Sequence, residues 1–211
     1  MELTKDTPKE DVLTLSSECK KCGHCCSFSG CYVLPQETKG IAGALNMDEK
    51  ELVSKYLEEA TLYNTKLYKT HTIKSDLPYG ECVFLNGKTC IIHEAKPLHC
   101  KVGSCKEHGE SALDWFYLNH LVNPNDPESI RQWASRLEHK KTIPGGNLHE
   151  LVQDKDRLEK ILSYEILRKE QDWEEELGLK PLKEEILKAN KLAAKEARKI
   201  LKKKRYSEGT K

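Results

Sequence analysis

The placement of cysteine constrains this chain more than any other feature of its sequence. Nine cysteines fall in two blocks, residues 19–31 and 82–105, and none follows Cys105. The first block, ECKKCGHCCSFSGC, holds five thiols in fourteen residues. Such density is typical of a disulfide framework, a zinc site or an iron–sulfur cluster, and each of these makes a different demand on the remaining sequence.

The N-terminus and the cysteine count disfavour disulfides. The first eighteen residues, MELTKDTPKEDVLTLSSE, are charged and lack the apolar stretch of a secretory signal, which predicts a cytoplasmic protein. Thiols stay reduced in the cytoplasm, and nine of them cannot all pair. No window approaches the roughly 18 apolar residues of a membrane span, so we expect no membrane association. A metal is the better interpretation of the thiols.

The adjacent pair Cys25-Cys26 favours a cluster of several irons over one zinc ion. Side chains of neighbouring residues diverge in helices and in strands, so one tetrahedral ion rarely takes both. The spacing Cys-x2-Cys-x2-Cys is that of ferredoxins without their next cysteine, because position 29 is serine. The second block lacks the close Cys-x2-Cys pair of a zinc ribbon. We therefore expect an iron–sulfur cluster, with zinc or mononuclear iron as the alternative.

Spacing and a reducing compartment predict that eight of the nine cysteines bind the metal. These ligands are Cys19, Cys22, Cys25, Cys26, Cys82, Cys90, Cys100 and Cys105. Two roles stay open for Cys31, which either binds the metal or simply packs. Histidines near the cysteines are secondary candidates, since thiols are plentiful. They are His24, His93, His99 and His108.

A hairpin in the second block decides whether two of these thiols share a face. Asn86-Gly87 between β-prone flanks is a strong turn signal. A two-residue turn there pairs Val83 with Cys90 and turns Cys82 and Cys90 to opposite faces. A three-residue loop beginning one residue earlier pairs Cys82 with Cys90 on one face. Because a shared metal centre needs both thiolates together, we expect the three-residue loop.

The remaining sequence predicts mostly helices. Before the second block, apolar spacing indicates helices over residues 36–45 and 46–63, the latter capped at Asn46, and residues 67–74 read as a strand. Residues 91–95 should form a helical turn, with Cys100 and Cys105 on irregular backbone after Pro97. Later helices are expected from Ser111, from Asp126-Pro127, over about 148–170, and finally up to about Arg205.

The predicted fold class is therefore mainly α, with a small β-hairpin. A metal-nucleated cysteine-cluster domain (residues 1–110) is followed by a helical region packed on it (111–180) and a basic C-terminal helix (181–211). Residues 182–211 hold eleven Lys and Arg against four Glu, a net charge of +7 on a chain whose total is +1. This end is nevertheless poor in aromatic residues, so a packed helix is favoured over a nucleic-acid contact.

With both blocks considered, the chain resembles the cysteine-cluster family of zinc- or iron-chelating domains with the motif CxxCxxCC. Three features carry the resemblance, over roughly residues 15–105. They are Cys19-x2-Cys22-Gly23-His24-Cys25-Cys26, the pair Cys82…Cys90, and Cys90-x5-Lys96-Pro97-x2-Cys100-Lys101. The chain departs from the family in having His93 where tyrosine is usual and Lys96 and Lys101 where arginine is common.

The resemblance implies an oxygen-sensitive iron–sulfur or mononuclear metal centre bound by the shared cysteines. The expected function is a metal-binding protein of unassigned activity. Because the family includes flagellin lysine N-methylases, the alternative is a metal-dependent group-transfer enzyme with S-adenosylmethionine as cofactor and a protein as partner or substrate. The chain has no Gly-x-Gly-x2-Gly motif, so a Rossmann methyltransferase is disfavoured.

Overall fold

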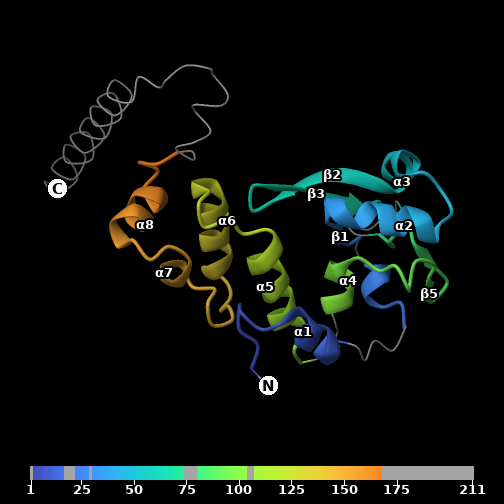
Figure 1. Cartoon of the computed structure of the whole chain (residues 1–211), viewed down its shortest axis with the longest axis horizontal. Coiled ribbons are helices and arrows are strands. Elements are labelled where there is room, and N and C mark those ends of the chain that lie inside the picture. Colours follow the sequence, from blue (N-terminus) through green and yellow to red (C-terminus); the bar gives the residue numbers. More distant parts are fainter. Residues whose placement is uncertain (1, 17–21, 29, 74–79, 104–106, 168–211) are drawn as a thin grey trace, which may run out of the picture.

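The computed structural model describes residues 2–16, 22–28, 30–73, 80–103 and 107–167 (Figure 1). Cys19, Cys105 and the helix expected to end near Arg205 lie outside these residues. Helices dominate the described part of the chain, and two small antiparallel sheets accompany them. The predicted fold class, mainly α with a small β part, is therefore confirmed. No helix in the described ranges combines the length and the apolar character needed to cross a membrane.

The elements follow one another without an internal repeat. The α-helices of the described residues are α1 (Lys9–Ser16), α2 (Thr38–Ala44), α3 (Glu49–Tyr56), α4 (Leu98–Val102), α5 (Gly109–His120), α6 (Pro127–Leu137), α7 (Leu148–Leu151) and α8 (Lys155–Leu162). Two 3₁₀ turns are η1 (Cys25–Ser27) and η2 (Pro35–Glu37). The strands are β1 (Tyr32–Val33), β2 (Leu57–Leu62), β3 (Thr65–Thr70), β4 (Leu85–Asn86) and β5 (Thr89–Cys90). One sheet has the order β1-β3-β2, and β4 pairs with β5.

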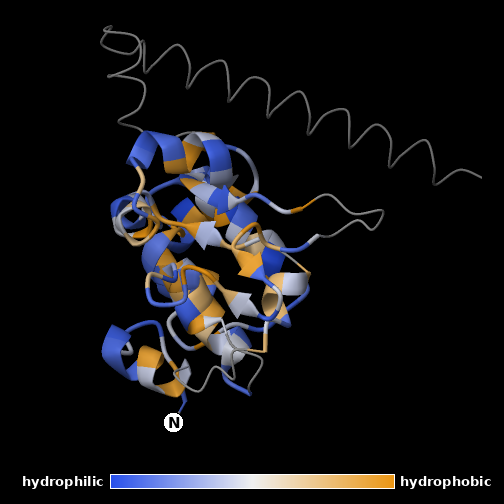
Figure 2. Ribbon diagram, turned by 90° about the vertical axis from the view of Figure 1, so that its right-hand side faces the viewer, coloured by the Kyte–Doolittle hydropathy of each residue, from blue (hydrophilic) through white to orange (hydrophobic). Residues whose placement is uncertain are grey.

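Two hydrophobic clusters hold these elements together. The first is centred on α5 and α6, where Phe116 and Trp133 are fully buried, and it includes α1, which packs against α4 and α5. The second lies where α2 and α3 meet the sheet, around Ile41, Leu52 and Phe84. In Figure 1 the helices α5 to α8 occupy one side of the molecule, and α2, α3 and the strands occupy the other. Figure 2 shows apolar and polar sides alternating on the helices, as burial of one face requires.

Several predicted elements are confirmed. Residues 36–45 form η2 and α2, and α6 begins at Pro127 with Asp126 as its N-cap, whose carboxylate accepts the Glu128 N–H at 3.0 Å. The helix expected from Ser111 is α5, which starts two residues earlier. The strand expected over residues 67–74 is β3, which begins at Thr65 and ends at Thr70. The boundaries between the expected domains stay a prediction.

The helix expected over residues 46–63 is wrong beyond Tyr56. Asp48, not Asn46, is the N-cap of α3, because its carboxylate accepts the Lys50 N–H at 2.9 Å. The following residues form β2, which pairs along its whole length with β3. Tyr63 and Asn64 join the two strands with φ of 51° and 57°, the conformation of a type I′ turn. Pairing with a neighbouring strand therefore overrides the helical spacing of the apolar residues.

The long helix expected over residues 148–170 is also wrong within the described residues. Two short helices take its place, each with its own cap. Asn147 and Glu150 form a capping box at α7, and Asp154 accepts the Arg157 N–H at 3.1 Å to begin α8. Val152 between them is extended, with φ −122° and ψ 96°. A cap residue in the middle of an apolar repeat starts a new helix here.

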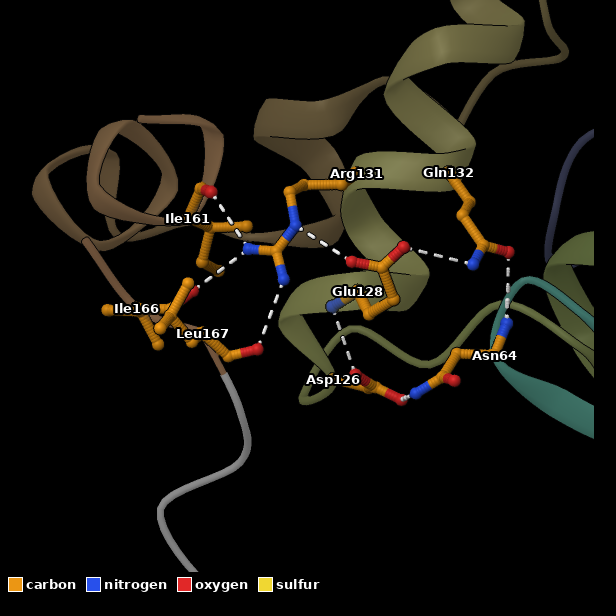
Figure 3. A network of polar contacts seen from close by, with 8 residues as sticks. All are labelled: Asn64, Asp126, Glu128, Arg131, Gln132, Ile161, Ile166 and Leu167. Atoms are coloured by element: carbon orange, nitrogen blue, oxygen red, sulfur yellow. Dashed lines mark hydrogen bonds and ion pairs between the residues drawn. The ribbon is translucent and has the colours of Figure 1, made fainter. Parts of the chain in front are cut away.

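Arg131 on α6 holds the chain where α8 ends (Figure 3). Its side chain is 7% exposed and forms an ion pair with Glu128 at 3.0 Å. The guanidinium also donates to the carbonyl oxygens of Ile161, Ile166 and Leu167 at 3.1, 2.9 and 3.1 Å. Carbonyl groups at a helix C-terminus lack partners within the helix. One buried cation therefore donates to carbonyl groups at and just beyond the end of α8, and it ties residues 161–167 to α6.

The same network joins the helical side to the sheet (Figure 3). Asn64, in the turn between β2 and β3, donates through its side chain to Asp126 at 2.7 Å. Its backbone N–H donates to Gln132 at 3.1 Å. The N-terminus of α6 and the tip of the hairpin are therefore held together by polar contacts in addition to the aromatic contact of Tyr63 with Trp133, whose ring centroids lie 5.3 Å apart.

We predict that Arg131→Met lowers the free energy of unfolding by about 3 kcal/mol, because three carbonyl groups lose a charged donor. Urea denaturation followed by circular dichroism measures the change. The matched control is Arg157→Met on α8, whose side chain makes no hydrogen bond with the described residues, and it should stay within about 0.5 kcal/mol. Equal effects of the two substitutions would contradict this role of Arg131.

Candidate metal centre

The two cysteine blocks meet through a backbone hydrogen bond. The Cys82 N–H donates to the carbonyl oxygen of Cys26 at 2.7 Å. Cys26 lies in η1, and the Cys26 N–H donates to the Gly23 carbonyl at 3.0 Å. Gly23 has φ +73°, and a Cβ atom there would lie 3.2 Å from the Lys88 carbonyl oxygen. The glycine of the motif therefore serves a tight turn that brings block one against the β4–β5 hairpin.

Cys31 lies deeper, beside Thr70 and Cys82. Its N–H donates to the Thr70 hydroxyl oxygen at 2.8 Å, and the Thr70 N–H donates back to the Cys31 carbonyl at 2.9 Å. The same hydroxyl oxygen is 3.4 Å from the Cys82 sulfur. Cys31 and Cys82 are 8% and 6% exposed, and Thr70 is fully buried. The sequence left the role of Cys31 open and gave no signal for Thr70.

Cys100 joins this inner group from α4. Interaction with the Cys100 thiol, together with burial, holds the pKa of Cys31 well above its usual range. The expectation that Cys100 lies on irregular backbone is wrong, because it sits in the helix Leu98–Val102. Glu37 accepts the Leu98 N–H at 2.6 Å and, through its other oxygen, the Leu34 N–H at 2.9 Å. This carboxylate fastens the start of α4 to the chain that follows β1.

The hairpin has neither of the registers considered from the sequence, and the expected three-residue loop is wrong. Leu85 pairs with Cys90 and Asn86 with Thr89, so the turn is Gly87-Lys88. Gly87 has φ +61° while Lys88 has a negative φ, the arrangement of a II′ turn with glycine first. Cys82 lies outside this ladder and instead forms an isolated bridge with Thr72, two residues beyond the end of β3.

Residues 91–95 form successive turns instead of the expected helical turn. The His93 N–H donates to the Cys90 carbonyl at 3.1 Å, and the Ala95 N–H donates to the Ile92 carbonyl at 3.0 Å. Ile92 is buried in the second cluster. Burial of this side chain, with Pro97 close behind, favours a compact turn over a helix. The turns lead the chain from Cys90 toward α4 and Cys100.

Two thiols of block one are exposed, and one of them lies beside a half-buried neighbour. The sulfurs of Cys25 and Cys26 lie 3.9 Å apart, and Cys22 and Cys25 are exposed. Hydrogen bonding with Cys26, aided by the Lys96 ammonium, lowers the pKa of Cys25 to about 6. The same contact raises the pKa of Cys26. Cys25 therefore ionises first, and its thiolate is stabilised by a lysine that the sequence had only marked as a departure from arginine.

Cys90 and Cys82 have thiols that resist ionisation in the metal-free protein. Burial raises the pKa of Cys90, and interaction with Cys31 raises that of Cys82. Both belong to the second hydrophobic cluster, together with Cys26, Cys31 and Cys100. The cluster that holds the sheet against α2 and α3 is therefore also the place where thiols from both blocks gather.

His99 and His24 pack against aromatic rings. The His99 ring contacts Tyr32 and Phe116 with centroid distances of 5.2 and 5.4 Å, and burial lowers its pKa to about 4. The His24 ring lies 5.0 Å from that of Phe28. These contacts favour packing over ligation for both side chains.

The donor chemistry of the site fits zinc or iron, since soft thiolate ligands select these metals. Five thiols lie in or against the second cluster, namely Cys26, Cys31, Cys82, Cys90 and Cys100, and Cys22 and Cys25 are exposed. Among the residues that the structure describes, no three His, Cys, Asp or Glu are placed as a group that could hold a metal ion. Cys19 and Cys105 lie outside those residues, so the eight-cysteine ligand set stays a prediction.

A cysteine-rich, mainly helical metal-chelating domain is the class to which this fold and these thiols point. Residues 18–117 match the family CxxCxxCC, described as a putative zinc- or iron-chelating domain, and this part of the chain is a domain of that family. The match spans both cysteine blocks and confirms the resemblance identified in the sequence. No curated protein and no solved structure matches the chain.

We predict that Glu37→Gln lowers the free energy of unfolding by about 1–2 kcal/mol. A carboxylate accepts both the Leu34 and Leu98 N–H groups, whereas an amide has one accepting oxygen and leaves one donor unpaired. Chemical denaturation measures the loss. Glu51→Gln, which alters an exposed ion pair with Lys55, is the control and should change stability by less than about 0.5 kcal/mol. A larger loss in the control would contradict the assignment.

Proposed function

We propose that this protein holds an iron–sulfur cluster through its two cysteine blocks, in a reducing compartment such as the cytoplasm. The proposal has one principal support: two of the proposed ligands 56 residues apart in sequence, Cys26 and Cys82, are joined by a backbone hydrogen bond of 2.7 Å, and cysteines of both blocks lie in or against the second hydrophobic cluster. The description of the family as zinc- or iron-chelating supports the metal-binding part. The proposed ligands are the eight cysteines named from the sequence.

Iron–sulfur is favoured over zinc by the number and placement of thiols. The seven cysteines in the described ranges exceed the four ligands of a structural zinc site. The neighbouring sulfurs of Cys25 and Cys26 suit separate metal atoms of one cluster better than one tetrahedral ion. A bound cluster supplies electron transfer or Lewis-acid chemistry. The chain itself contributes the buried thiols and the nearby charge of Lys96, which offsets the negative charge of the thiolates.

The group-transfer alternative stays a prediction. This function requires a substrate site beside the thiols. Aromatic side chains of the second cluster pack against one another, as Tyr56 does with Phe84 at a centroid distance of 5.5 Å. The function proposed for the protein is therefore metal binding.

Protein purified without oxygen is expected to be brown and to contain iron and acid-labile sulfide. Elemental analysis and electron paramagnetic resonance of the reduced protein measure both. Cys90→Ser should weaken retention of iron on the order of 10-fold or more, because a ligand is lost. Thr89→Ser, in the same strand and exposed, is the matched control and should keep wild-type iron.

Two results would count against this function. Colourless protein with stoichiometric zinc would replace the cluster by a zinc site while leaving chelation in place. Protein that takes up neither iron nor zinc, even after anaerobic reconstitution with iron and sulfide, would remove metal binding altogether. Iron that persists equally in Cys90→Ser and in wild type would remove this cysteine from the ligand set.

Removal of the metal is expected to destabilise the folded state. Strands β4 and β5 have two residues each, too few for an independently stable hairpin. A metal present at 100–1000 times its dissociation constant contributes about 3–4 kcal/mol to folding. Thermal denaturation before and after chelation should therefore show a lower melting temperature for the stripped protein. Identical melting temperatures would show that binding and folding are independent here.

A further inference from the structure

Thr70 is the last residue of β3 and has no exposed surface. Its hydroxyl oxygen lies 2.8 Å from the Cys31 nitrogen and 3.4 Å from the Cys82 sulfur, and the hydroxyl also interacts with the Cys31 thiol. These two cysteines come from different blocks. A single buried hydroxyl therefore lies between the two parts of the chain that the proposed centre requires to converge.

The directions of these two hydrogen bonds follow from the groups involved. The Cys31 N–H can only donate, so the Thr70 oxygen accepts from it. The hydroxyl keeps its own proton, and the Cys82 sulfur lies within reach of that proton. A cysteine that binds a metal is a thiolate and has no proton to give. In the metal-bound protein only the hydroxyl can donate across the contact between Thr70 and Cys82, and a hydrogen bond to a charged acceptor is stronger than one to a neutral acceptor.

The backbone holds this hydroxyl in place. β1 and β3 pair through Tyr32 with Lys69, and Cys31 with Thr70 continues that ladder by one step through the Thr70 N–H and the Cys31 carbonyl. Gly30 makes the approach possible, because a Cβ atom at this position would lie 2.7 Å from the Thr70 hydroxyl oxygen. A group mounted on a sheet positions ligands more accurately than one on a loop.

We infer that Thr70 is a positioning residue of the centre: its hydroxyl donates a hydrogen bond to the Cys82 sulfur and keeps Cys31 beside it. This inference rests on the proposed function, since it concerns the same thiols. Partners of metal ligands orient the ligand and tune its electron donation, and their loss typically costs 10- to 100-fold in metal affinity.

The test is an anaerobic titration of metal-free protein with Co²⁺, whose thiolate charge-transfer absorption reports on the sulfur directly. Thr70→Val removes the hydroxyl at nearly constant volume. It should weaken Co²⁺ binding about 10- to 100-fold. The charge-transfer band should move to lower energy, because the sulfur electrons lose a stabilising donor. Thr70→Ser keeps the hydroxyl and should retain the wild-type band and affinity.

Thr65→Val is the matched control. Thr65 lies on the same strand and its hydroxyl donates to the Leu121 carbonyl at 2.7 Å, away from the thiols. It should bind Co²⁺ as wild type does. Circular dichroism of each metal-free variant establishes folding. If the Thr70→Val variant does not fold, Thr70→Ala supplies a second variant without the hydroxyl. The band energy is measured at saturating Co²⁺, so it does not depend on the affinity.

The outcomes separate this inference from the function on which it rests. Wild-type protein that shows no charge-transfer band with Co²⁺ and binds neither iron nor zinc overturns the proposed function and the inference together. If wild-type protein shows the band, and a variant without the hydroxyl has the same band energy and the same Co²⁺ affinity, then only the role of Thr70 is overturned. A serine variant that shifts as valine does would also overturn it, since the hydroxyl would then be irrelevant.

Discussion

The organisation of the cysteine-rich side depends on one constraint, namely that the backbone groups of Cys31 and Cys82 are buried and must be paired. The end of β3 meets this requirement for Cys31, because Thr70 accepts the Cys31 N–H with its hydroxyl oxygen and donates its own N–H to the Cys31 carbonyl. Thr72, two residues on, lies opposite Cys82. The Cys82 N–H donates to the Cys26 carbonyl, and the Cys82 carbonyl accepts the Leu85 N–H. The cysteine blocks converge because the same stretch of chain lies between them.

That constraint has a consequence for the state of the sulfur atoms. Interaction with another cysteine, together with burial, raises the pKa of Cys31 and of Cys82, and burial raises that of Cys90. Cys25 differs, because hydrogen bonding with Cys26 and the nearby Lys96 ammonium lower its pKa. The metal-free site thus combines an outer thiol that ionises readily with inner thiols that are compatible with a hydrophobic core.

Local chemistry was predictable from the sequence and tertiary pairing was not. Asp126 before Pro127 identifies a helix start by itself, and the structure agrees. Residues 57–62 have helical spacing, yet β3 offers six backbone partners and β2 forms instead. The Asn86-Gly87 signal correctly indicates a hairpin. The turn itself is Gly87-Lys88, so Cys90 pairs with Leu85 and not with Val83 or Cys82, because glycine takes the first turn position and Leu85 is buried in the core.

The candidate site shows the same limit. The cysteines were visible in the sequence, whereas Thr70 and the carboxylate of Glu37 were not, because their roles depend on contacts with residues 39 and 61 positions away. Threonine and glutamate are common at many other positions, so no pattern of residue types singles these two out. Side chains that orient a site are recognisable only when the fold brings their partners together.

Helix α4 links the thiols to the rest of the molecule. Its Cys100 belongs to the second hydrophobic cluster, while Leu98 and Val102 on the same helix belong to the first. The Ser16 hydroxyl at the end of α1 donates to the Val102 carbonyl at 3.2 Å, and Glu37 fastens the other end of α4. Because α4 has only five residues, a shift of the Cys100 sulfur would also shift the buried side chains of Leu98 and Val102. Packed interiors have little free volume for such a shift. The position of the Cys100 sulfur is therefore set jointly by contacts with the sheet side and by contacts with the helical side.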